Sequence, residues 1–139
     1  MSAMRTPPAS AAALAGMLLA AGATHLVAPR PYESLIPAAL GSPRAWVLGS
    51  GLAELACGAA VAVPASRRAG GFAAAALLVA VFPGNVVMAL RSRAPGVGRG
   101  GPPPTGLAAL TRRPVVAWGR LPLQVPLVAW ALSVARSAR

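Results

Sequence analysis

The sequence of 139 residues has no lysine and no aspartate, and Glu33 and Glu54 are its only acidic residues. It has one cysteine, Cys57, and one histidine, His25. A single cysteine excludes an internal disulfide, a Cys-x-x-C redox pair and a thiolate metal cluster, and we predict no metal site. Any redox chemistry must therefore come from a bound cofactor or a partner protein. Because Cys57 lies in an apolar run, we interpret it as a small buried hydrophobe.

Charged residues are scarce, at 11% of the chain against 56% hydrophobic residues, which is far from the composition of a soluble domain. The arginines nevertheless give a formal net charge of +11. In a soluble protein such a surplus suggests nucleic-acid binding. Here the arginines lie in the gaps between long apolar runs, with no basic stripe interleaved with aromatic residues. We therefore expect them to meet the headgroups of a lipid bilayer, and we expect no nucleic-acid partner.

Four apolar segments, residues 9–28, 45–63, 71–90 and 115–135, are long enough to cross a membrane. About twenty residues at 1.5 Å per residue span a hydrocarbon core of about 30 Å. The first segment has an alternative interpretation as a cleaved signal peptide, but cleavage would discard the helix that carries His25. The fourth segment contains Arg120, Pro122 and Pro126. We interpret it as a kinked span, because neighbouring helices can satisfy the carbonyls that proline frees.

The predicted fold is all-α: a single domain over residues 1–139 that forms an integral membrane four-helix bundle with both termini on one side. Residues 64–70 predict a tight turn, residues 29–44 an interfacial segment that caps one end of the bundle, and residues 91–114 a flexible loop rich in Gly, Pro and Arg. Small residues recur four apart, as at Gly16 and Ala20 and at Ser50, Glu54 and Gly58. Such stripes predict close helix packing.

Five polar residues fall in the same half of the bilayer when depth is compared between the spans: His25, Glu54, Asn85, Arg120 and Gln124. An ionised side chain at this depth costs roughly 2.5–3.5 kcal/mol, so we expect Glu54 and Arg120 to pair inside the bundle with the other three around them. Each residue also has a structural interpretation, such as an interhelical hydrogen bond or an arginine that reaches the surface. Together they favour a ligand-binding pocket. Trp46 and Trp118 at the same face are typical of an aromatic belt.

Several runs in the spans share their pattern with a known family: Ala21-Gly22-Ala23-Thr24-His25, Ser50-Gly51-Leu52-Ala53-Glu54, Phe82-Pro83-Gly84-Asn85 and Arg120-Leu121-Pro122-Leu123-Gln124. Over residues 15–132 the chain resembles the small DoxX-like membrane proteins of bacteria. The resemblance implies a four-helix membrane bundle and service in respiratory-type redox complexes, as for the DoxD subunit of thiosulfate:quinone oxidoreductase. The neighbouring MauE-like proteins suggest thiol chemistry, and the single Cys57 argues against it here.

We therefore expect a bacterial inner-membrane protein that binds a quinone or a similar small apolar ligand as a subunit of a redox complex. Quinone carbonyls need hydrogen-bond donors, which His25, Asn85, Arg120 and Gln124 can supply, while Glu54 can exchange protons. Two alternatives stay open: a non-catalytic membrane anchor or assembly subunit, and passage of a small solute or a proton. Whether the chain is an enzyme also stays open. The arginine count, five outside the spans on the terminal side against seven on the other, mildly favours the 91–114 loop inside, whereas the resemblance suggests that the termini lie inside.

Overall fold

The computed structural model describes residues 8–93, 106, 109 and 113–138. This part of the chain contains four long helices, α1 (Ala9–Val27), α3 (Pro43–Ala62), α4 (Arg67–Ser92) and α6 (Pro114–Ser137). Two short helices, α2 (Arg30–Glu33) and η1 (Ala38–Leu40), lie between α1 and α3. Each long helix is apolar and long enough to cross a membrane, which confirms the predicted all-α membrane bundle. Most of the predicted loop 91–114 lies outside the described residues.

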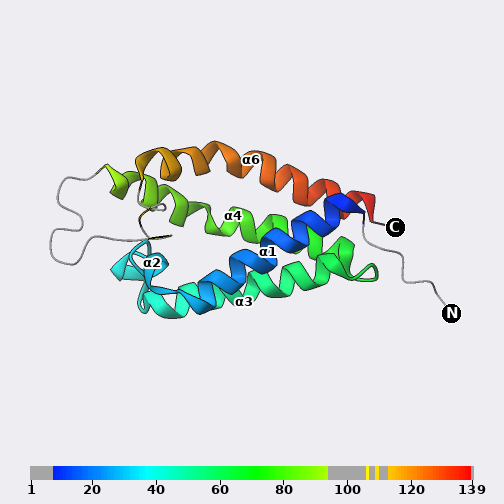
Figure 1. Ribbon diagram of the computed structural model, residues 1–139, viewed down its shortest axis with the longest axis horizontal. Helices are drawn as coiled ribbons and strands as arrows, with labels where there is room; N and C mark the ends of the chain where they lie inside the picture. Colours follow the sequence, from blue (N-terminus) through cyan, green and yellow to red (C-terminus); the bar gives the residue numbers. More distant parts are fainter. Residues whose placement is uncertain (1–7, 94–105, 107–108, 110–112, 139) are drawn as a thin grey trace.

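The four helices form two pairs, in which α1 packs along α3 and α4 packs along α6 (Figure 1). α3 also packs against α4, whereas α1 touches α6 only slightly. The start of α1 and the end of α6 lie at the same end of the bundle, where the Trp130 indole donates a hydrogen bond to Ser10 Oγ at 2.8 Å. The described chain therefore begins and ends on one side, as an even number of spans predicts.

The turn between α3 and α4 is held by Arg67, whose side chain is buried. Its guanidinium donates hydrogen bonds to the carbonyl oxygens of Val61 at 3.0 Å and Ala62 at 3.3 Å. These carbonyls belong to the last turn of α3, where no helical N–H is left to satisfy them, and a cation there also opposes the helix dipole. The prediction of a turn over residues 64–70 is wrong for its second half, because α4 begins at Arg67 itself.

The apolar core is distributed unevenly along the bundle. At the end that holds both termini, one cluster draws buried side chains from all four long helices, among them Leu14, Cys57, Val61, Ala74 and Val134. Cys57 is therefore buried in the core, as predicted. Nearer the other end, Met88, Ala89 and Ala117 of α4 and α6 form a second cluster against Leu35. Within the described residues α1 and α3 contribute no side chain to this second cluster. At this end of the bundle the buried core therefore does not join the α1/α3 pair to the α4/α6 pair.

The helices α1 and α3 approach closely at glycines. A Cβ on Gly22 would lie 2.6 Å from the carbonyl oxygen of Gly51, and a Cβ on Gly58 would lie 3.1 Å from that of Ala15. Only glycine lets the two backbones come so near, which is how membrane helices commonly pack. The predicted stripe is right for Gly58 and wrong for Gly16, where a Cβ would have no atom within 4 Å.

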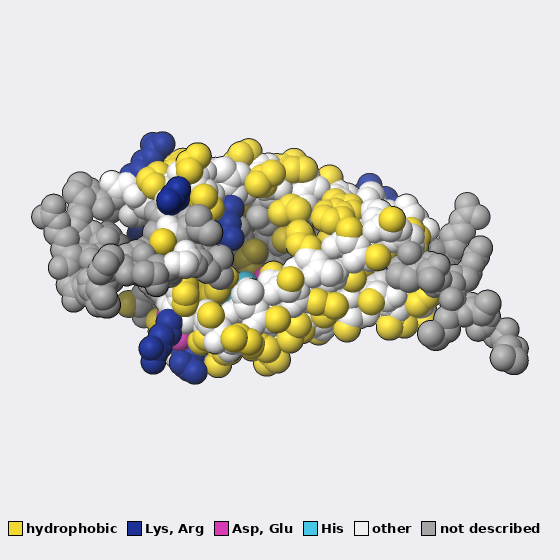
Figure 2. Space-filling model, in the orientation of Figure 1, with side chains coloured by type: hydrophobic (Ala, Val, Ile, Leu, Met, Phe, Trp, Pro, Cys, Tyr) yellow, Lys and Arg dark blue, Asp and Glu magenta, His cyan; other side chains and the backbone are white. Residues whose placement is uncertain are grey.

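The outer surface of the long helices is apolar, with Leu52, Val79, Leu123 and Val125 each more than half exposed. Figure 2 shows hydrophobic side chains along the middle of the molecule and most arginine side chains near its two ends. Trp46 is also 54% exposed and donates to the carbonyl of Leu40 at 2.8 Å. This distribution is typical of helices that are surrounded by lipid hydrocarbon along their length and by a polar interface at their ends.

Candidate functional site

A histidine and a glutamate from neighbouring helices meet between α1 and α3. His25 lies two residues before the end of α1, and Glu54 lies in the middle of α3. His25 Nδ1 is 2.7 Å from Glu54 Oε2, and the two side chains are 17% and 13% exposed. The close approach of α1 and α3 makes this contact possible, since a Cβ on Gly51 would lie 2.8 Å from the Cβ of His25. The sequence predicted both residues for the site but not that they pair.

Tyr32 joins the pair from the short helix α2. Its ring centroid lies 4.2 Å from that of His25, with the ring planes tilted by 52°. The Tyr32 hydroxyl donates to Thr24 Oγ1 at 3.4 Å, and Thr24 donates in turn to the carbonyl of Ala21 at 2.7 Å. The sequence analysis missed Tyr32 as a site residue. A signal was present, because Tyr32 is the only tyrosine and lies in the segment predicted to cap this end of the bundle.

Asn85 and Gln124 form a second polar group between α4 and α6. Asn85 Nδ2 donates to Gln124 Oε1 at 3.2 Å, and the Gln124 amide donates to the backbone carbonyl of Leu78. That carbonyl lies in the turn of α4 that precedes Pro83, where proline removes one helical hydrogen bond and displaces the backbone. Both side-chain amides therefore have partners inside the α4/α6 pair, and this contact holds the two helices together.

The prediction that Glu54 pairs with Arg120 is wrong. The structure describes both residues and has no ion pair between them; Arg120 Nη1 instead lies 3.9 Å from the sulfur of Met88. The reason is the pairing of the helices. Arg120 is on α6, which packs along α4, whereas Glu54 is on α3 and is reached by His25 of α1. The five predicted residues thus form separate groups on the two halves of the bundle.

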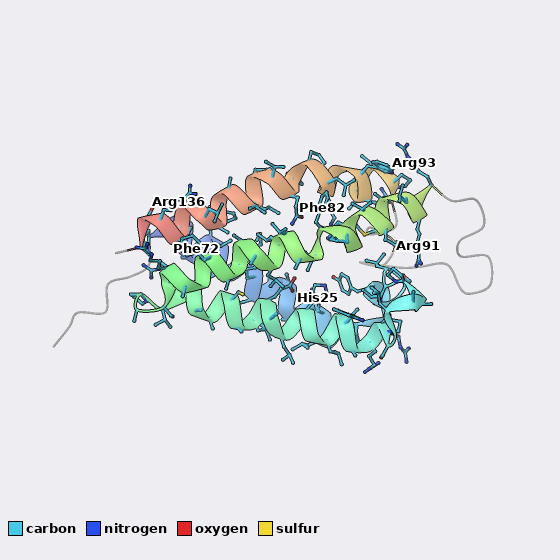
Figure 3. The ribbon with its side chains drawn as sticks, turned by 180° about the vertical axis from the view of Figure 1, so that it is seen from behind. His25, Phe72, Phe82, Arg91, Arg93 and Arg136 are labelled. Carbon is cyan, nitrogen blue, oxygen red and sulfur yellow. The ribbon has the colours of Figure 1, made fainter. Side chains whose placement is uncertain are left out.

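A hollow lies between these two halves. In the space-filling view, the cyan histidine and an adjacent magenta carboxylate lie at its floor, and dark blue arginine atoms approach it from the side of α6 (Figure 2). Figure 3, from behind, shows His25 among α1, α3 and α2 and on the side that faces α4. The His25–Glu54 pair is therefore neither sealed in the core nor on the outer surface, since both side chains keep part of their surface exposed among the described residues.

Comparison with known proteins places the chain in a family. Residues 14–135 match the family described as a domain of unknown function, DUF8561. The chain belongs to this family. The match begins within α1, ends in the last turn of α6 and so includes every residue of the candidate site. No match was found among curated proteins or among solved structures.

The hydrogen-bond donors and acceptors of His25 and Glu54 determine which chemistry the site of this DUF8561 protein can support. With Glu54 ionised, the carboxylate can only accept, so the hydrogen lies on His25 Nδ1 and Nε2 is left for a ligand. Nε2 accepts a hydrogen bond when the imidazole is neutral and donates one when it is protonated. A carboxylate that orients a histidine and stabilises its protonated form is a common arrangement for moving protons. Among the described residues no group of three or more His, Cys, Asp or Glu side chains could hold a metal ion.

Proposed function

We propose that this chain is a DoxX-like protein of the bacterial inner membrane that binds a quinone beside His25 and Glu54, as a subunit of a membrane redox complex. The observation that carries the proposal is an accessible histidine–carboxylate pair at bilayer depth, 2.7 Å apart. Ionisable groups inside a membrane are costly and usually mark functional sites. A quinone suits this position because its ring partitions into the bilayer while its carbonyl oxygens need hydrogen-bond donors.

The residues present fit such a head group. His25 Nε2 offers one polar contact, and the Tyr32 ring, tilted by 52° against the imidazole, adds an aromatic contact beside it. Arg120 on the opposite half has only a thioether contact among the described residues, so its guanidinium can donate to an oxygen in the hollow. A bound quinone supplies two-electron, two-proton redox chemistry. The chain holds and moves the proton: His25 at Nε2, with Glu54 fixing the ring and stabilising the imidazolium.

A non-catalytic anchor or assembly subunit is the second candidate function. The hydrogen bonds of Asn85 and Gln124 favour it, because these two residues bond to each other and to the α4 backbone and so join α4 to α6. Polar contacts of this kind specify how membrane helices pack. In this reading the His25–Glu54 pair likewise holds α1 to α3, and no small molecule is bound.

Quinone content separates the two candidates. We expect the full chain, purified in mild detergent from bacterial membranes and extracted with organic solvent, to release quinone in an amount comparable with the protein. Glu54→Leu should retain several-fold less, because leucine cannot accept the hydrogen bond that holds the His25 ring in place. Glu33→Leu is the matched control and should behave as wild type. Absence of quinone from the wild type, or equal retention by a folded Glu54→Leu, would rule out the proposal and favour the anchor.

A further inference from the structure

A second cavity, separate from the His25–Glu54 pair, lies where α1 ends. Its volume is about 430 Å³, and it is lined by Val27, Ala28, Pro29, Arg30, Pro31 and Arg44. The apolar lining comes from the last turn of α1 and the prolines that follow, and Arg44 comes from the first turn of α3. One wall is therefore apolar and another is cationic, at the level where the apolar helix surface stops.

The two arginines retain donors for a ligand. Arg44 Nη1 is 3.6 Å from Glu33 Oε1, which is longer than a hydrogen bond, and that oxygen has no hydrogen-bond partner. The Arg44 side chain is 62% exposed, and within the described residues Arg30 forms no ion pair. Figure 2 shows arginine side chains gathered around an acidic one at the α2 end of the molecule. Two guanidinium groups against one carboxylate leave a local excess of positive charge, and guanidinium binds phosphate well.

We propose that this cavity binds the phosphate headgroup of an anionic phospholipid. The cavity has both apolar and cationic walls, and this combination favours a lipid over soluble phosphate as its occupant. Val27 is 85% exposed beside the arginines, so an occupant with a charged head and an apolar remainder satisfies both walls. The cavity also lies at the end of two membrane-spanning helices, where headgroups are found. The proposal concerns a site distinct from the quinone site and does not depend on it.

The test counts lipids bound to the purified full chain by native mass spectrometry during titration with phosphatidylglycerol and with phosphatidylcholine. We expect phosphatidylglycerol to bind more tightly, and Arg30→Gln and Arg44→Gln each to weaken it about fivefold. Glu33→Gln should strengthen it, because the carboxylate no longer competes for Arg44. Arg113→Gln is the matched control: Arg113 is exposed at the same end of the bundle and lies outside the cavity, so its loss should have little effect.

Three results would overturn the proposal. An equal loss with Arg113→Gln would mean that diffuse surface charge, rather than this cavity, attracts the lipid. Equal binding of phosphatidylcholine would mean that the site does not select an anionic headgroup. Displacement of phosphatidylglycerol by an equal concentration of inorganic phosphate would mean that the cavity is a site for a soluble anion. Thermal unfolding of each variant shows that it remains folded, which is expected because both cavity arginines are exposed.

Discussion

The close approach of α1 and α3 at Gly22 gives a prediction whose size can be worked out. A methyl group there would lie 2.6 Å from the backbone oxygen of Gly51, which cannot move out of the way as a side chain can. Overpacking of this kind costs about 1–3 kcal/mol. Alanine also favours a helix over glycine by about 0.5–1 kcal/mol. Gly16→Ala on the same helix gains that propensity without a clash, because nothing lies within 4 Å.

The difference between the two variants isolates the steric term, since both carry the same propensity gain. We expect Gly22→Ala to be less stable than Gly16→Ala by about 1–3 kcal/mol, which corresponds to a fall in Tm of roughly 4–12 °C. Thermal unfolding of the purified chain in detergent, followed by circular dichroism, measures it. If Gly22→Ala is as stable as Gly16→Ala, then α1 and α3 do not meet at this glycine and the geometry of the His25 site is incorrect.

Three further predictions address other contacts. Arg67→Met should lower the free energy of unfolding by about 1–3 kcal/mol, because it leaves two carbonyls at the end of α3 without a hydrogen-bond donor. Arg68→Met, at an exposed position, should change the free energy of unfolding little. Equal effects of the two substitutions would contradict the role of Arg67 at the end of α3. Gln124→Leu should lower the free energy of unfolding by about 1 kcal/mol, because the hydrogen bonds of Gln124 to α4 are lost. An unchanged Tm would show that the packing of α4 and α6 does not depend on these hydrogen bonds. Cysteine labels at Ser137 and Arg113 should react from opposite sides of the membrane, and labelling from one side would contradict a spanning α6.

The sequence predicted how deep each polar residue lies but not which of them meet. Depth follows from counting residues along an apolar span, and that count agrees with the structure in placing His25 near the end of α1, Asn85 toward the end of α4 and Glu54 in the middle of α3. A contact also depends on which helices are neighbours and which faces they present. In a soluble helix a polar outer face gives this direction. Here the helices are apolar on nearly all sides, so the pattern could not show that Glu54 faces α1 or that α6, which carries Arg120, packs along α4.

The glycines supply the directional information that hydrophobicity does not. Gly22 lies three residues before His25, and Gly51 three residues before Glu54, so each glycine shares a helix face with the polar residue that follows it. A contact between the two glycine faces therefore brings His25 against Glu54. The side chains meet at 2.7 Å only because neither backbone carries a Cβ at this crossing. Helix packing and the polar pair are thus two consequences of one interface, and a substitution that separates α1 from α3 must disturb both.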